Sequence, residues 1–243
     1  MERRVSIEDV LGKVEKLHKL TESKLGVDDI RWIALNELSR KIRASLNALH
    51  FIPYEEYAVL CAPTNLLYRS MITDLMTSLL ISQVNDEQLD DIIYFFDLQF
   101  ANSLSIALKA NIEICKMTYP DDGEAFEERG KEYQVKLYDD LKECLESAKG
   151  EDWNLKSQRA IKINGNDFKG QVSQIYKILK SYEEVAGFAY IYQYYRLFSQ
   201  SEHFSIKGRT INYKQSFHEE YYNKVRGFVY LGADYLIRKY SVN

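Results

Sequence analysis

The chain has 243 residues, a formal net charge of −4, 46% hydrophobic residues and 28% charged residues. These proportions are those of a globular protein, and they exclude a disordered or fibrous chain. With 3 prolines and 11 glycines, the sequence also lacks the frequent turns that an all-β sandwich requires.

Cysteine usage and hydropathy indicate where such a protein works. Cys61, Cys115 and Cys144 are widely spaced and include no CxxC pair, which argues against a disulfide framework and a structural zinc site. The charged N-terminus has no apolar segment typical of a signal peptide. The most apolar stretch contains Arg69 and Asp74, so we expect a buried helix there rather than a membrane span. We therefore predict a cytoplasmic protein without a metal, a cofactor or a membrane contact.

Charge is distributed unevenly along the chain. Residues 84–152 contain 18 acidic and 7 basic side chains, whereas residues 153–243 contain 7 acidic and 14 basic ones. A basic C-terminal third favours an anionic partner, and ordinary solvated surfaces are the alternative explanation.

The first part of the chain predicts three helices. Ser6 is a suitable N-cap for the first helix, and Gly26 ends it. Asp28 and Asp29 open the second helix, and Pro63 suits the first turn of a third that runs to about residue 84.

Two more helices are expected in the acidic middle of the sequence. The fourth begins at Asp86 and ends at the turn 119–123. Its apolar stripe, which we expect to face the core, consists of Leu89, Ile92, Phe96, Ser103, Ala107, Ala110, Ile114 and Met117. The fifth helix, about 124–148, has one narrow apolar stripe and an acidic back, as is typical of a peripheral helix packed on one side.

Residues 149–170 interrupt the helical period. Asn164-Gly165 is compatible with the turn of a small β-hairpin and also with an irregular loop. A sixth helix is predicted from about residue 171 to beyond 198, and a seventh over about 216–240. The sequence therefore predicts an all-α fold, a single antiparallel bundle of six or seven helices. We expect one domain over residues 1–243, with its weakest join at 149–170.

The predicted sixth helix carries the most informative polar residues. Its apolar seam turns polar at the C-terminal end, where Arg196 and His203 are seven residues apart. On a helix this spacing is two turns, or about 10 Å along the axis. Ser199 lies between them and Tyr192 lies one turn before Arg196. A polar network inside the bundle would explain this pattern, and so would a binding or catalytic site.

A buried guanidinium requires a carboxylate or a bound anion nearby. Asp74, on the apolar third helix, is the expected partner of Arg196. Arg69 is the other charged residue of that helix, but five residues separate it from Asp74, about 140° around the axis, so the two cannot face one neighbour. The candidate binding residues are Tyr192, Ser199, Arg69 and Asp74.

Two features together resemble a bacterial family of unknown function. They are Trp153 followed by Lys156-Ser157, and the segment that contains Tyr195, Ser199 and His203. Members of that family are helical, carry an Arg and a carboxylate on an early apolar helix, and end with a Tyr-x-x-x-Ser-x-x-x-His signature. The resemblance extends over roughly residues 60–205.

The spacing of Arg196 and His203 also resembles the Arg-x6-His signature of the HEPN superfamily of small helical bundles. That superfamily includes metal-independent endoribonucleases of toxin and defence systems. The resemblance implies that His203 acts as general acid or base on a ribose 2′-hydroxyl or leaving 5′-oxygen. It also implies that Arg196 stabilises the phosphorane-like transition state.

Three functions stay open at this point. The first is a non-catalytic protein that binds a ligand or partner at its Arg/Ser/His site, and the second is the HEPN-like endoribonuclease. The third is a scaffold that forms a homodimer through its aromatic-rich helices. The partner is unknown, with RNA or a nucleotide as the candidates for the basic C-terminal third.

Overall fold

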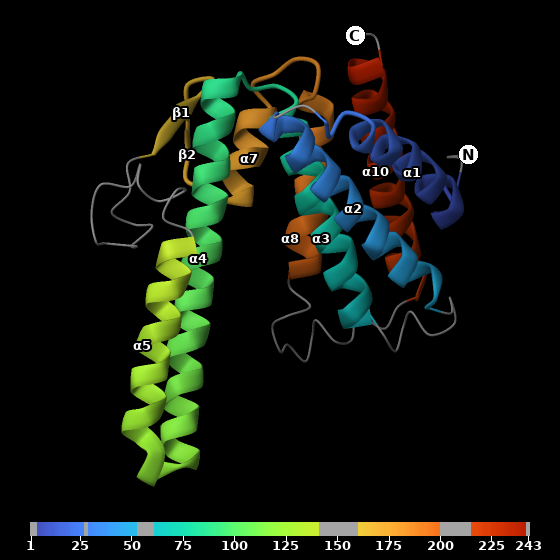
Figure 1. The fold of residues 1–243 in the computed structure, drawn as a ribbon. Helices are drawn as coiled ribbons and strands as arrows, with labels where there is room; N and C mark the ends of the chain where they lie inside the picture. The colour runs from blue at the N-terminus through green and yellow to red at the C-terminus, as the bar shows by residue number, and fades with distance from the viewer. Residues whose placement is uncertain (1–3, 27–28, 53–60, 141–159, 200–214, 242–243) are drawn as a thin grey trace. The chain divides into compact units, whose positions relative to one another are not determined.

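A computed structural model describes residues 4–26, 29–52, 61–140, 160–199 and 215–241 (Figure 1). The described chain is mainly α-helical, which confirms the predicted fold class. It divides into two compact units, residues 1–86 with 172–243 and residues 87–171, here called the first and second units. A single bundle of six or seven helices is not confirmed.

The first unit begins with helices whose ends follow from their caps. Ser6 caps α1 in a reciprocal capping box, because its hydroxyl accepts from the Asp9 amide while the Asp9 carboxylate accepts from the Ser6 amide. Asp29 caps α2 by accepting from the Arg31 amide at 2.8 Å. The elements of this unit are α1 (Ile7–Glu22), α2 (Ile30–His50), α3 (Cys61–Ile81), α7 (Val172–Leu179), the 3-10 helix η3 (Ala186–Ile191), α8 (Tyr192–Ser199) and α10 (Gln215–Ser241).

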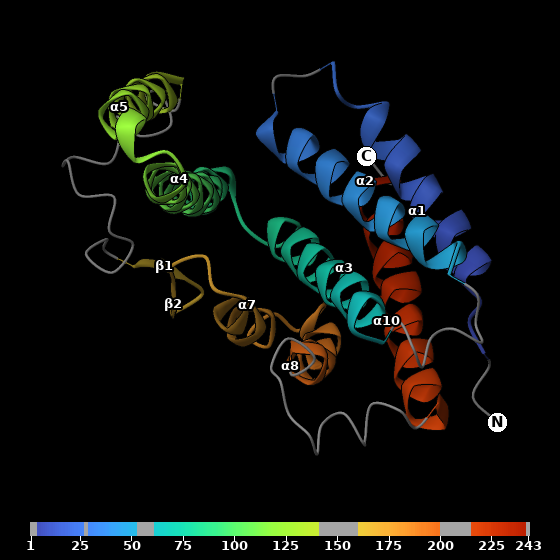
Figure 2. The same cartoon turned by 90° about the horizontal axis from the view of Figure 1, so that it is seen from below.

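Helix α3 is the centre of the first unit. It contacts α2, α7, α8 and α10, and Figure 2 shows it between α2 on one side and α7 and α8 on the other. Residues 71–82 are buried on nearly every side of the helix, as an all-round apolar sequence predicts. The helices around it contribute a continuous core that includes Val14, Leu17, Leu35, Ile42, Leu46, Val225, Val229 and Leu236.

The prediction of one continuous sixth helix is wrong. It is α7, a turn, η3 and α8 in succession. The Ser181 hydroxyl donates to the Ile178 carbonyl at 2.6 Å, and the Tyr182 amide donates to the Leu179 carbonyl at 3.2 Å. These bonds satisfy the last carbonyls of α7 and end it, since serine side chains compete with helical backbone bonding. The polar stripe from Gln193 onward therefore belongs to the short helix α8.

The second unit contains a helical hairpin and a two-stranded sheet. Its elements are α4 (Asp86–Thr118), the 3-10 turn η2 (Pro120–Asp122), α5 (Gly123–Asp140), β1 (Ile161–Ile163) and β2 (Asn166–Phe168). Helix α5 packs against α4, where Gly130 approaches the Ile112 side chain closely and the Lys116 ammonium lies 2.7 Å from the Glu127 carboxylate. The last predicted residues of the fifth helix, 141–148, lie outside the described residues.

The small β-hairpin is one of the two alternatives that the sequence left open, and the structure confirms it. Strands β1 and β2 pair antiparallel with Ile163 opposite Asn166. Asn164 and Gly165 have φ angles of 45° and 77°, as a two-residue turn between twisted strands requires. Phe168 then packs on Phe95 and Phe96 of α4, with ring centroids 6.1 and 6.0 Å apart.

The stripe predicted to face the core along α4 is correct only in its first part. Leu89 and Ile92 are fully buried. From Ser103 onward every residue of the stripe is exposed, and Ile114 and Met117 are 58% and 78% exposed. Helical spacing identifies residues that share a face, but it does not determine whether another element covers that face. None of the helices in the described ranges has the length and hydropathy needed to cross a membrane.

Candidate functional site

Helix α8 positions three of the predicted site residues. Arg196 is exposed in its last turn, where a cation interacts favourably with the helix dipole. Ser199 is half-buried, and its hydroxyl donates to the Tyr195 carbonyl of its own helix at 2.7 Å. His203 lies outside the described residues. Arg196 therefore reaches solvent, and the Ser199 hydroxyl is satisfied within α8.

Asp74 lies on α3 and is 7% exposed. Loss of water on burial raises the pKa of its carboxyl group to about 6. Its neighbours are Ser70, whose hydroxyl lies 3.5 Å from the Asp74 carboxylate, and the charged Lys41 and Glu37 of α2. Asp74 therefore faces α2. The prediction that it pairs with Arg196 of α8 is wrong, because α8 packs on another side of α3.

Arg69 lies on the side of α3 that packs against α8. Its Nη2 atom donates to the Tyr195 hydroxyl at 3.3 Å, and its Cζ atom lies 5.0 Å from the centre of the Tyr195 ring. The guanidinium is thus held by a hydrogen bond and a cation–π contact. The separation of about 140° between Arg69 and Asp74 explains why one reaches α8 while the other faces α2.

Three tyrosines of α7 and α8 stack in a line next to Arg69. The rings of Tyr176 and Tyr192 are 4.9 Å apart with 20° between their planes. The rings of Tyr192 and Tyr195 are 5.6 Å apart with 14° between their planes. Lys180 lies 5.5 Å from the Tyr176 ring, so a cation is next to each end of the line. We call Tyr176, Tyr192 and Tyr195 the tyrosine row.

The tyrosine row is half-buried along its length. None of the ion pairs among the described residues includes Arg196 or Lys180. Aromatic rings with cations beside them can contact both the flat face and the negative charge of a ligand. The sequence indicated Tyr192 and Arg69 separately, but only the packing of α3, α7 and α8 brings them together.

A second polar cluster, which sequence reasoning missed, lies in the core between α3 and α10. Arg226 is 6% exposed, and its Nε atom donates to the Val5 carbonyl at 2.8 Å while Nη1 donates to the Tyr68 hydroxyl at 3.1 Å. The Tyr222 hydroxyl donates to Asn65 at 2.6 Å, and its ring stacks on Tyr68 at 4.4 Å. The signal in the sequence is an arginine directly after Val225 on the apolar face of the last helix. These bonds attach the N-terminal segment to the core, which is a structural role.

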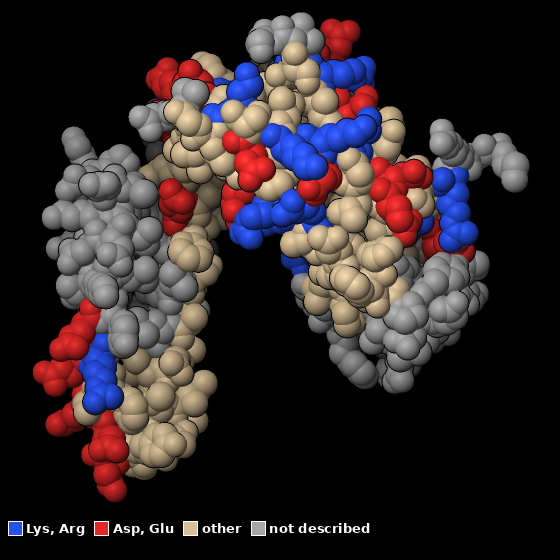
Figure 3. Space-filling model, turned by 45° about the vertical axis from the view of Figure 1, so that its right-hand side comes forward, with Lys and Arg blue, Asp and Glu red and all other residues tan. Residues whose placement is uncertain are grey.

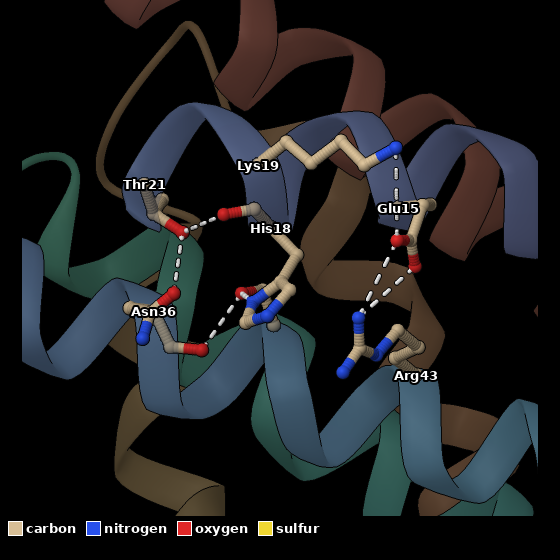
Figure 4. Close-up of polar contacts among 7 residues, drawn as sticks. Glu15, His18, Lys19, Thr21, Asn36 and Arg43 are labelled. Atoms are coloured by element: carbon tan, nitrogen blue, oxygen red, sulfur yellow. Dashed lines mark hydrogen bonds and ion pairs between the residues drawn. The ribbon is translucent and has the colours of Figure 1, made fainter. Parts of the chain in front are cut away.

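Polar contacts also link α1 to α2 (Figure 4). The buried His18 ring lies 3.1 Å from the Ser39 hydroxyl, and Thr21 donates to Asn36 at 3.2 Å. Closer to the start of α1, Arg43 pairs with Glu15 at 3.2 Å on a groove of about 540 Å³. Because these groups bond to one another across the helix pair, they fix its register.

Within the described part of the chain, no group of histidine, cysteine and acidic side chains is arranged to hold a metal ion. No family model, curated protein or solved structure matches this chain. The tyrosine row with Arg69, Lys180 and Arg196 is the candidate site that its geometry offers.

Proposed function

We propose that this protein binds a phosphate-bearing ligand of the single-stranded RNA class on the surface formed by α7 and α8. The observation that supports the proposal is the tyrosine row with Arg69 and Lys180 over its two ends. Proteins that bind single strands with little sequence preference combine stacked aromatic rings with cations that follow the backbone.

The geometry suggests a role for each residue. Lys180 is exposed, and its flexible side chain places the ammonium group over the Tyr176 ring. A base can therefore displace the ammonium group and stack on that ring. Arg196 extends into solvent one residue after Tyr195, where its planar donors suit a phosphate. The basic C-terminal third of the sequence favours the same class of ligand, although the whole chain has a net charge of −4. Binding should therefore be weak and strongly dependent on salt.

Fluorescence anisotropy with a labelled oligouridylate tests this proposal. We expect the full chain to bind at low salt, and Arg196→Ala to bind more weakly and to lower the slope of log affinity against log salt by about one. Arg238→Ala is the matched control, because Arg238 is an exposed arginine on α10 whose partner is Asp234. Absence of binding by the wild type at low salt, or equal losses in the two variants, would contradict the proposal.

RNA cleavage is the second candidate function, and the exposure of Arg196 is the observation that favours it. An arginine that stabilises a phosphorane-like transition state must reach substrate from solvent. Incubation of labelled RNA with wild type, Arg196→Ala and His203→Ala in the presence of a metal chelator tests it. Cleavage by the wild type but by neither variant would support an endoribonuclease. Binding of RNA by the wild type without cleavage would exclude the endoribonuclease and support the binding function.

A further inference from the structure

The exposed face of α4 has the spacing of a helix-pairing seam. Its members follow one another at intervals of three and four residues, and all of them are exposed in the second unit. They are Phe100, Ser103, Ala107, Ala110, Ile114 and Met117. We call these six residues the α4 seam. Phe100 is 58% exposed, which extends the exposed apolar surface one turn before Ser103.

The α4 seam lies on the side of the helix away from α5. Helix α5 is held against α4 by Ile112 and Lys116 and by the contact between the Tyr119 and Phe126 rings. Ile112 is two residues before Ile114, which places the two side chains on opposite sides of α4. Among the described residues of the second unit, packing of α5 therefore leaves the seam uncovered.

The order of residue sizes along the seam is self-complementary. If two copies of α4 run antiparallel about a two-fold axis midway between Ala107 and Ala110, each alanine faces the other alanine of the partner helix. Ser103 then faces the partner copy of Ile114, and Phe100 faces the partner copy of Met117. Small side chains at the centre let the helices approach closely. Farther from the axis, the large Ile114 side chain packs on the small Ser103, and the Met117 thioether packs on the Phe100 ring.

The exposed area and the charges also suit a second copy. With about 200 Å² for a fully exposed large side chain, the seam offers about 500 Å² per copy, so a pair buries about 1,000 Å², the smallest area expected of a specific interface. Between residues 100 and 118 the charged residues are Lys109, Glu113 and Lys116, so no block of like charge opposes pairing. Figure 3 shows acidic side chains along one edge of the helical hairpin and an uncharged surface along the other.

From these observations we propose that the protein self-associates through the α4 seam, with two copies of α4 packed antiparallel. The occupant of the seam is a second copy of this chain. This inference does not depend on RNA binding, because the seam belongs to the second unit and the tyrosine row to the first.

Sedimentation velocity of the full chain over a range of concentrations is the first test. We expect a concentration-dependent shift from 28.5 kDa to twice that mass. Ile114→Lys should abolish the shift, since it places a charge in the pairing surface. Ala125→Lys is the control, because Ala125 is an exposed residue of α5 outside the seam. A wild type that stays monomeric, or an Ile114→Lys variant that still dimerises, overturns the proposal.

Cross-linking with a short bifunctional thiol reagent tests the orientation. In the antiparallel pair, a mixture of Phe100→Cys and Met117→Cys chains should form the mixed cross-link, because the two positions face each other. Both variants are made in a Cys115→Ser background, because Cys115 of the partner helix lies two residues from Met117. There, Phe100→Cys alone should stay at the level of its parent, because its two copies lie about 25 Å apart. Cross-linking of Phe100→Cys alone would indicate parallel pairing and would contradict the proposal.

Discussion

Arg226 of α10 donates to the hydroxyl of Tyr68 of α3 at 3.1 Å in the core of the first unit. The same guanidinium donates to the carbonyl of Val5. The Arg226 side chain thus joins α3 and α10 to the segment that precedes α1. A positive charge in the core is stable only while its donors are used in this way.

The first prediction concerns this contact. Arg226→Met should lower the free energy of unfolding by about 2–3 kcal/mol, because it removes two hydrogen bonds made by a charged donor. Combined with Tyr68→Phe, it should show a coupling energy of about 1–2 kcal/mol. Urea unfolding followed by tryptophan fluorescence measures both quantities. Arg238→Met, an exposed substitution on the same helix, should change stability by less than about 0.5 kcal/mol. Strictly additive effects of the two core substitutions would contradict the prediction.

The second prediction is a pH dependence at Asp74. Burial raises the pKa of this carboxyl group from 3.8 to about 6, so the folded state holds the proton more tightly than the unfolded state. Stability from this residue is therefore largest below pH 3.8 and is lost as the pH rises to about 6. Asp74→Asn, which is neutral at every pH, should be more stable than the wild type above pH 6 by up to about 3 kcal/mol.

Unfolding curves between pH 4 and pH 8 check this expectation, and the advantage of Asp74→Asn should shrink as the pH falls. Asp234→Asn provides a contrast of opposite sign. The hydrogen bond from Lys13 lowers the pKa of Asp234, so this residue stabilises the fold above its usual titration range and loses that effect in acid. Equal pH profiles for the two variants would refute the assignment of Asp74 as a buried, desolvated acid.

The third prediction compares two glycines of α10. A Cβ atom at Gly227 meets nothing within 4 Å, whereas at Gly232 it would lie 2.7 Å from Cδ1 of Leu75. Gly227→Ala should stabilise the protein by about 1 kcal/mol through helix propensity. Gly232→Ala gains the same term but forces Leu75 to move, so it should be about 1–3 kcal/mol less stable than Gly227→Ala. Thermal unfolding of the two variants decides the order, and a Gly232→Ala protein as stable as Gly227→Ala would show that Leu75 relocates freely.

The fourth prediction separates the ring of Tyr192 from its hydroxyl. Tyr192→Phe keeps the stack with Tyr176 and Tyr195, so oligouridylate binding should stay within about two-fold of the wild type. Tyr192→Leu removes the middle ring, which holds Tyr176 and Tyr195 in place, so affinity should fall by at least about 5-fold, which corresponds to about 1 kcal/mol. Anisotropy titrations measure both, with far-ultraviolet circular dichroism as the check on folding. A Leu variant that binds as well as the Phe variant would remove the tyrosine row from the binding site.

Local chemistry in the sequence was sufficient to predict much of the secondary structure. The Ser6 cap, the turn at 119–123 and the last helix all lie where they were expected. The Asn164-Gly165 turn does so too, because two consecutive residues with positive φ select a tight hairpin. These features depend on interactions within a few residues, which a single sequence contains in full.

The candidate site was only partly predictable. Arg69, Tyr192 and Arg196 could be named from their types and spacing, but their neighbours could not. Asp74 faces α2 and Arg69 faces α8 because α3 is surrounded by helices, and each side of it meets a different one. The break after Leu179 was also missed, because an apolar seam continues through the turn and η3 as it would through a helix.

The sequence by itself determined which residues share a face and where most helices begin and end. The tertiary structure alone decided which faces are covered, as the exposed seam from Phe100 to Met117 and the buried Arg226 illustrate. The physical reason is range: caps, turns and helical period arise from bonds between near neighbours in the chain. Burial depends on packing between segments that are far apart in sequence, such as Val5, Tyr68 and Arg226.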